Sequence, residues 1–236
     1  MNPIKFLHLS DLHSHLPKGL ESYGGRIIIT GDLTDDGASF EYRRLEKFLN
    51  SLNGRVNFTP GNHDLGIRGN LFSPASAEAF DALSWRVQDH LWTAKKPMVR
   101  VFGEPGNRVT LIGLNSCLMT ESIWDYAQGE IGRAQLAMLD TELNQAEGVK
   151  ILTLHHHPFF DSPTMRLTDA DKLMAMIAGR VDVLLFGHRH EEANYGGKHG
   201  IPHILAAPAN WIAGHGAEIA VDKGQVTITR HPVRFY

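Results

Sequence analysis

Short apolar runs alternate with amphipathic segments along this chain, and that alternation indicates an α/β fold. Five runs rich in Ile, Leu, Val and Phe are expected to be buried strands. These runs are Ile4–Leu9, 26–29, Val56–Thr59, 151–154 and Val183–Phe186.

Apolar residues with helical spacing fill several of the intervals between the strands. Leu45, Phe48, Leu49 and Leu52 lie at positions i, i+3, i+4 and i+7 and predict a helix over 39–52. Asn53 and Gly54 provide its stop signal. Further helices are predicted over 74–90, 133–146 and 169–178, with Ser73 and Thr168 as N-caps.

The pattern changes after Pro202 to short alternating strands. The segments 217–221 and 225–230 are separated by Asp222-Lys223-Gly224, a three-residue hairpin loop with glycine at its end. We expect this antiparallel tail to form a second sheet that packs against the first.

Each of the five predicted strands is followed by a short polar motif. In chain order the motifs are Asp11-Leu12-His13, Gly31-Asp32, Gly61-Asn62-His63-Asp64, His155-His156-His157-Pro158 and Gly187-His188-Arg189-His190. Side chains just beyond strand ends emerge at one edge of a sheet, so these loops are expected to converge. Carboxylate, imidazole and amide groups without a thiolate suit divalent Mn, Fe, Co or Zn.

The ordered set of motifs resembles the calcineurin-like metallophosphoesterase superfamily over nearly the whole chain. The sequence Leu154-His155-His156-His157-Pro158 is similar to the bacterial branch of cyclic-nucleotide and glycerophosphodiester phosphodiesterases. The resemblance implies an α/β fold in which two mixed sheets lie face to face, flanked by helices, as an α-β-β-α sandwich. Because the motifs run from residue 11 to residue 190, we expect one domain over residues 1–236.

The resemblance also implies a pair of divalent metal ions and assigns their ligands. Asp32 would bridge the two ions; Asp11, His13 and His190 would complete the first site, and Asn62, His156 and His188 the second. His155 replaces His156 if the preceding strand ends one residue earlier. Mn²⁺ or Fe²⁺ is expected, with Zn²⁺ and Co²⁺ as alternatives, because metal identity depends on availability as well as ligands.

His63 and Asp64 are predicted to be catalytic. The resemblance implies that His63 reaches toward the substrate, where it would protonate the leaving oxygen or stabilise charge on the phosphoryl group. Asp64 follows directly and would accept the other imidazole N–H, which fixes the tautomer. The glycines Gly31, Gly61 and Gly187 are given backbone roles in tight turns.

Composition narrows the choice of partners and compartment. The 236 residues carry a net charge of −3, so no chain-wide basic field favours nucleic acid. Cys117 is the only cysteine, which excludes an intrachain disulfide. No apolar run approaches a membrane span, and the strand starting at Ile4 leaves no room for a secretory leader. We therefore expect a cytoplasmic protein without membrane contact, whose oligomeric state the sequence leaves open.

The leading functional prediction is hydrolysis of a phosphodiester bond in a small substrate, such as a cyclic nucleotide or glycerophosphodiester, by a hydroxide that bridges two metals. A phosphomonoesterase that uses Arg68, and a nuclease that uses Lys95 and Lys96 near Trp92, are the alternatives within enzymes. The non-enzyme alternative is a protein-binding scaffold that uses the face formed by residues 65–106.

Overall fold

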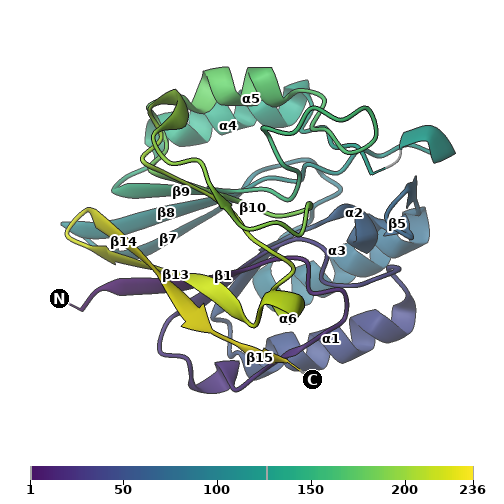
Figure 1. Ribbon diagram of the computed structural model, residues 1–236, viewed down its shortest axis with the longest axis horizontal. Helices are drawn as coiled ribbons and strands as arrows, with labels where there is room; N and C mark the ends of the chain where they lie inside the picture. Colours follow the sequence, from purple (N-terminus) through teal and green to yellow (C-terminus); the bar gives the residue numbers. More distant parts are fainter. Residues whose placement is uncertain (1, 126, 236) are drawn as a thin grey trace.

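Two β-sheets lie face to face in the computed structural model, which describes residues 2–125 and 127–235 (Figure 1). The first sheet has the strand order β14-β13-β1-β3-β4, and the second β11-β12-β10-β9-β8-β7. The strands of the first sheet are β1 Ile4–Leu9, β3 Arg26–Thr30, β4 Val56–Thr59, β13 His215–Asp222 and β14 Gln225–Pro232. Those of the second are β7 Met98–Glu104, β8 Asn107–Gly113, β9 Val149–Thr153, β10 Val183–Phe186, β11 Ala193–Asn194 and β12 His203–Ala206.

Both sheets are mixed, with parallel strands at the centre and antiparallel strands at the margins. Strands β1, β3 and β4 run parallel, as do β8, β9, β10 and β12. All five predicted strands are present, but they are divided between the sheets: β1, β3 and β4 in one, β9 and β10 in the other. The expectation of a single sheet edge is therefore corrected. The motifs converge because the carboxyl ends of the parallel strands in the two facing sheets lie close together.

Helices cover the outer face of each sheet. Figure 1 shows α1 beside the first sheet and α4 and α5 beside the second, which gives the predicted four-layer sandwich. The helices are α1 Ser39–Ser51, α2 Asn62–Leu65, α3 Pro74–Gln88, α4 Arg133–Gln145, α5 Ala170–Ile177 and α6 Asn210–Ala213. Within residues 2–125 and 127–235, none of them is long and apolar enough to cross a membrane.

Short elements complete the chain at its surface. Two minor antiparallel pairs form, one between β2 and β15 and the other between β5 and β6. Their bounds are β2 Pro17–Lys18, β15 Arg234–Phe235, β5 Gly66–Ile67 and β6 Leu71–Phe72. Single turns of 3₁₀ helix are η1 Leu20–Ser22, η2 Ile123–Asp125 and η3 Lys198–Gly200.

The core follows the two-residue period of the strands. Along β10, Val183 and Leu185 belong to the apolar cluster between the sheets, while Leu184 and Phe186 belong to the cluster under α4 and α5. All four side chains are fully buried. Burying such a side chain contributes about 1.5–3 kcal/mol, so a strand that is apolar on both faces is held firmly between two layers.

The C-terminal hairpin differs from its prediction. Strands β13 and β14 pair antiparallel with Asp222 opposite Gln225, so the loop has two residues, Lys223 and Gly224, instead of the predicted three. Strand β13 also pairs with β1, from Ile4 opposite Val221 to His8 opposite Ala217. The hairpin therefore extends the first sheet, and the prediction that it forms a second sheet is wrong. Its alternating pattern specified an antiparallel ladder but not which strand it would join.

The two predicted helix caps had different outcomes. The Ser73 side chain accepts a hydrogen bond from the Ser76 backbone N–H, and Pro74 opens α3, as predicted. Thr168 does not cap α5, which begins at Ala170 after Asp169. The Thr168 hydroxyl instead donates to the Gly129 carbonyl at 2.9 Å, so a bond to a neighbouring loop replaces the expected cap.

Candidate metal centre

Five polar loops converge at the carboxyl ends of the parallel strands of the two sheets. Several residues of these loops have an uncommon backbone conformation. Asp11, His13, Asp32, His188 and His190 all adopt a left-handed backbone conformation, with φ between 43° and 75°. Residues other than glycine adopt it uncommonly, and such strain persists where the surrounding structure holds it and is concentrated at functional sites.

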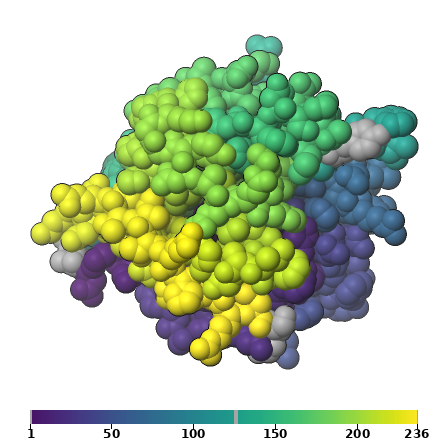
Figure 2. Space-filling view, in the orientation of Figure 1, coloured from purple at the N-terminus to yellow at the C-terminus, as the bar shows by residue number. Residues whose placement is uncertain are grey.

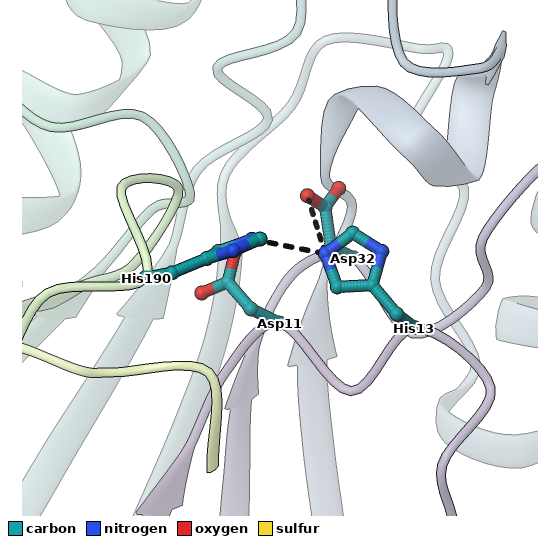
Figure 3. A group of neighbouring side chains, drawn as sticks. All are labelled: Asp11, His13, Asp32 and His190. Atoms are coloured by element: carbon teal, nitrogen blue, oxygen red, sulfur yellow. Dashed lines mark hydrogen bonds and ion pairs between the residues drawn. The ribbon is translucent and has the colours of Figure 1, made fainter. Parts of the chain in front are cut away.

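Asp11, His13, Asp32 and His190 form one cluster, the outer group, in which each residue offers a ligand atom within 4.8 Å of the others (Figure 3). The Nε2 atoms of His13 and His190 lie 3.0 Å apart. Nε2 of His190 lies 3.4 Å from Oδ1 of Asp11, and Nε2 of His13 lies 3.8 Å from Oδ2 of Asp32. The side chain of His190 is 44% exposed, so this group reaches solvent.

Asp32, His155 and His188 form a second cluster, the inner group. Nε2 of His155 lies 3.2 Å from Oδ2 of Asp32 and 3.1 Å from Nδ1 of His188. Oδ1 of Asn62 lies 3.0 Å from the same nitrogen, and its amide is oriented by a bond from Nδ2 to the Gly69 carbonyl. Asp32 belongs to both groups, as the predicted bridging ligand should.

The chemistry of these donors fits divalent metal ions. A ring nitrogen carries at most one proton, so Nε2 of His155 cannot hydrogen bond with a carboxylate, an amide oxygen and a second imidazole nitrogen at once. Nε2 of His190 faces both Nε2 of His13 and Oδ1 of Asp11, and its single proton can serve only one of them. Cations at these two places would resolve both contacts, and imidazole with carboxylate is a ligand set for Mn, Fe, Co or Zn.

The structure selects His155 rather than His156 for the inner group. Nδ1 of His156 lies 2.9 Å from Oγ of Ser116 and Nε2 lies 3.2 Å from the Ala127 carbonyl, so both ring nitrogens are used away from Asp32. The predicted strand 151–154 ends one residue earlier, at Thr153. We therefore replace His156 by His155 as the proposed ligand, which is the alternative that an earlier strand end implied.

Burial and charge give the inner group unusual proton affinities. Burial would raise the pKa of Asp32, but the charge of His155 and of neighbouring histidines holds it well below the ordinary range. Against the effect of burial, the charge of Asp32 raises the pKa of His155 to about 9. Burial, together with His155, lowers the pKa of His188 to about 3. Nδ1 of His188 is thus available as an uncharged ligand.

The backbone of His63 lies next to Asp32, the proposed bridging ligand, and its ring faces the outer group. Its backbone N–H donates to Oδ1 of Asp32 at 3.0 Å, and its ring meets that of His13 edge to face, with centroids 4.6 Å apart. Nδ1 donates to the Asp35 carbonyl at 2.6 Å. Burial alone would lower the pKa of His63, but the charge of Asp32 and this hydrogen bond together raise it above its ordinary value. A raised pKa favours the protonated ring, and a protonated imidazole beside the proposed metal ligands would be suited to donate a proton.

Asp64 does not have the predicted contact with His63. Its fully buried carboxylate accepts backbone N–H groups from Gly61, Leu33 and Thr34, at 2.9, 3.2 and 2.8 Å. Burial and the charge of Asp32 raise its pKa to about 7, against these hydrogen bonds. The aspartate therefore joins the second motif to the third, and the prediction that it orients His63 is wrong. Residues adjacent in the first turn of a helix point in different directions, so succession in sequence did not imply contact.

Asp35 is a residue of the site that the motif analysis missed. Its carboxylate oxygen lies 3.1 Å from Nδ1 of His13, while its carbonyl holds His63. Carboxylates on the second nitrogen of a ligand histidine fix the ring and its tautomer. The only sequence signal was an acidic residue three positions after Asp32. Ser116, which holds the His155-His156 turn through both backbone N–H groups, carried no signal.

Two glycines show why side chains are excluded from the turns. A Cβ on Gly31, at φ +89°, would lie 2.5 Å from Nδ1 of His155. A Cβ on Gly187 would collide with the side chains of Ser10 and Asp11. The His188 backbone N–H beside it donates to both oxygens of Asp11, at 3.1 Å. Glycine therefore allows loops from the two sheets to approach within hydrogen-bonding distance.

Known proteins resemble this chain to different extents. The chain is 27% identical over 194 residues to a 3',5'-cyclic-nucleotide phosphodiesterase of Nostoc sp., which covers 78% of this chain and 61% of the relative. It is 29% identical over 197 residues to the 3',5'-cyclic adenosine monophosphate phosphodiesterase CpdA of Escherichia coli K12, covering 79% and 61%. The chain thus spans about three fifths of the length of these curated relatives.

A structural likeness and a family model complete the comparison. GAP50, described as the anchor in the inner membrane complex of Plasmodium, matches with a TM-score of 0.62 at 12% identity, covering all of this chain and 90% of that one. At this identity the likeness shows the fold alone. The model of the calcineurin-like phosphoesterase family matches residues 4–192, which contain every motif of the metal centre. The chain therefore belongs to the calcineurin-like phosphoesterase family.

Proposed function

We propose that this chain is a metal-dependent phosphoesterase that hydrolyses a phosphodiester bond in a small substrate, a cyclic nucleotide in the first place. The observation that carries the proposal is the outer and inner groups sharing Asp32, with His63 beside them. The names of the relatives, which are cyclic-nucleotide phosphodiesterases, support the choice of substrate.

The residues of the site have different roles in the proposed reaction: some would bind metal ions and one would donate a proton. Asp11, His13 and His190 would hold one divalent ion, and Asn62, His155 and His188 the other, with Asp32 shared. Ions bound there supply Lewis acidity, which activates water for attack and neutralises charge on the phosphate. His63 would donate a proton to the leaving oxygen: the Asp35 carbonyl holds one proton on Nδ1, and Nε2 would carry the proton that is transferred.

The extra negative charge of a monoester calls for additional cations, and two basic residues near the metal motifs already have other partners. Arg68, the residue named for a monoesterase, is exposed, and the substrate panel below tests its role. Arg189, inside the last motif, pairs with Glu191 at 2.9 Å and stacks on Phe160. Lys95, a residue named for a nuclease, is partly buried and donates to the Cys117 carbonyl at 2.7 Å, which holds its ammonium group away from a nucleic-acid groove. Neither residue is placed to neutralise a dianionic phosphate in the centre.

A substrate panel tests the proposal. Protein loaded with Mn²⁺ would be assayed with 3',5'-cyclic AMP, glycerophosphoethanolamine, bis-p-nitrophenyl phosphate, p-nitrophenyl phosphate and single-stranded DNA, with metal content measured in parallel. We expect about two ions per chain, faster turnover of small diesters than of the monoester or DNA, and no turnover after chelation. An Asp32→Ala variant should lose both metal and activity, and retained activity in that variant would refute the shared-ligand role. A metal-free wild type would favour the scaffold alternative.

A further inference from the structure

An aromatic pair lies beside the metal centre and has no part in the ligand set. The rings of His15 and Trp211 are stacked, with centroids 3.9 Å apart and an angle of 6° between their planes. Trp211 is 36% exposed, and the next residue, Ile212, is 67% exposed. Both belong to α6, outside residues 4–192 that the family model matches.

The pair is close to the outer group because of its place in the chain. His15 follows the ligand His13 by two residues, so their Cα atoms are at most about 7 Å apart. Nδ1 of His15 lies 3.2 Å from the Leu12 carbonyl, which holds its ring against the same turn. Trp211, stacked on His15 and partly exposed, therefore lies within the reach of a substrate whose phosphate occupies the centre.

The position of α6 is fixed against that turn by a buried side chain. Asn210 is fully buried, its Oδ1 accepts the Ser10 backbone N–H, and its Nδ2 donates to the His215 carbonyl. Ser10 immediately precedes the ligand Asp11. In Figure 1, α6 lies against the loops at the ends of β1 and β13, and in Figure 2 the yellow-green and yellow C-terminal segments lie at the surface of the same face. The aromatic wall is therefore prearranged and open to solvent.

We propose that Trp211, supported by His15 and extended by Ile212, binds the nucleobase of the substrate by stacking and hydrophobic contact. The proposal rests on the proposed function, since it names the part of a cyclic nucleotide that this wall would recognise. A flat heterocycle is the ligand that fits a partly exposed indole, because its π-face stacks without demanding particular hydrogen bonds. A diester without a ring would gain nothing from the wall.

The test compares two diesters in Trp211→Ala, Trp211→Phe and Trp85→Ala. Trp85 is 55% exposed on α3 and provides a matched deletion of a surface indole. In Trp211→Ala we expect KM for 3',5'-cyclic AMP to rise about 5- to 100-fold, with kcat within about twofold. Glycerophosphoethanolamine kinetics and metal content should be unchanged. Trp211→Phe should recover most of the loss, and Trp85→Ala should behave as wild type.

Equal losses for both diesters in Trp211→Ala, or no loss for cyclic AMP, would overturn the proposal. Trp211→Leu keeps the test valid if the alanine variant does not fold, because leucine fills space without a π-face: a normal KM for ringless substrate with a raised KM for cyclic AMP would support the wall. Should the wild type turn over neither diester, the proposed function fails by itself. Calorimetric binding of AMP to the Mn²⁺-loaded protein then decides the inference: weaker binding in Trp211→Ala or Trp211→Leu than in the wild type supports it, and equal binding refutes it.

Discussion

The outer and inner groups share Asp32 but are built differently. The inner group lies between the sheets, where His155 and His188 are at most 4% exposed and Ser116 fixes the turn behind them. The outer group includes the half-exposed His190, and His13 depends on Asp35, a residue of a surface loop. Ligands held by buried strand ends need little further support, whereas ligands at the rim depend on loops that must themselves be held.

The largest difference is expected between the deletion of His155, in the inner group, and the deletion of its neighbour His156, outside that group. His155→Ala should lower diester turnover about 100- to 1,000-fold and remove about one metal per chain, because a lost Lewis acid costs several kcal/mol of transition-state stabilisation. His156→Ala removes a residue bonded to Ser116 and Ala127 and should reduce thermal stability while keeping both ions. Metal analysis and melting curves check both. One ion in His156→Ala and two in His155→Ala would restore the choice made from sequence.

That pair of residues shows where sequence reasoning reached its limit. The motifs and apolar runs placed Asp11, His13, Asp32, His188 and His190 correctly at strand ends, because each motif follows its strand directly. Within the triple histidine, one residue of strand length reverses which side chain faces the centre. The pattern of apolar residues alone fixes a strand end only to within a residue or two. The choice between His155 and His156 therefore depends on the folded structure.

Other features of the structure could not be predicted from the sequence because they depend on contacts between distant segments. The C-terminal hairpin was predicted, but its pairing with β1 joins residues more than 200 positions apart. Asp64 was assigned to its neighbour His63, although its partners are Leu33 and Thr34 on another loop. Asp35 has no motif of its own, and its role depends on how its loop folds back over His13.

A smaller effect confined to the outer group should follow from Asp35→Ala. Removing a carboxylate that holds a ligand histidine typically costs 10- to 100-fold in metal affinity. We expect one of the two Mn²⁺ ions to bind about that much more weakly, while the other is unaffected, as measured by competition with a chelator. Asp36→Ala, a change at the adjacent exposed aspartate, is the control. Equal weakening of both ions would contradict the division into two differently supported groups.

The Glu41→Gln substitution removes a charge that holds the loop behind the outer group. It should mainly lower the stability of the protein. The Glu41 carboxylate accepts hydrogen bonds from the Ser14 hydroxyl and from the backbone N–H groups of Asp35 and Ala38, at 2.5, 2.9 and 2.9 Å. Hydrogen bonds to a charged group contribute about 1.5–3 kcal/mol, so we expect roughly 2 kcal/mol less stability in urea unfolding. Glu46→Gln on the same helix, whose partner Arg86 is half exposed, should cost less than about 1 kcal/mol. Similar losses in the two variants would remove Glu41 from this role.

The smallest predicted effect is a difference in titration between the two groups in metal-free protein. Burial lowers the pKa of His188 to about 3, whereas the hydrogen bond to Asp11 raises that of His190 above its ordinary value of 6.5. A depressed pKa means that the unfolded chain binds more protons, so the contribution of His188 is present above pH 6.5 and is lost as pH falls toward 3. The contribution of His190 has the opposite sign: it is present below pH 6.5 and is lost as pH rises through the folded pKa. Ring signals followed by NMR after chelation should therefore show His188 uncharged from pH 5 to 8 and His190 titrating above 6.5. Titration of His188 within that interval would mean that the inner group is open to water, and the contrast between a buried and an exposed metal site would disappear.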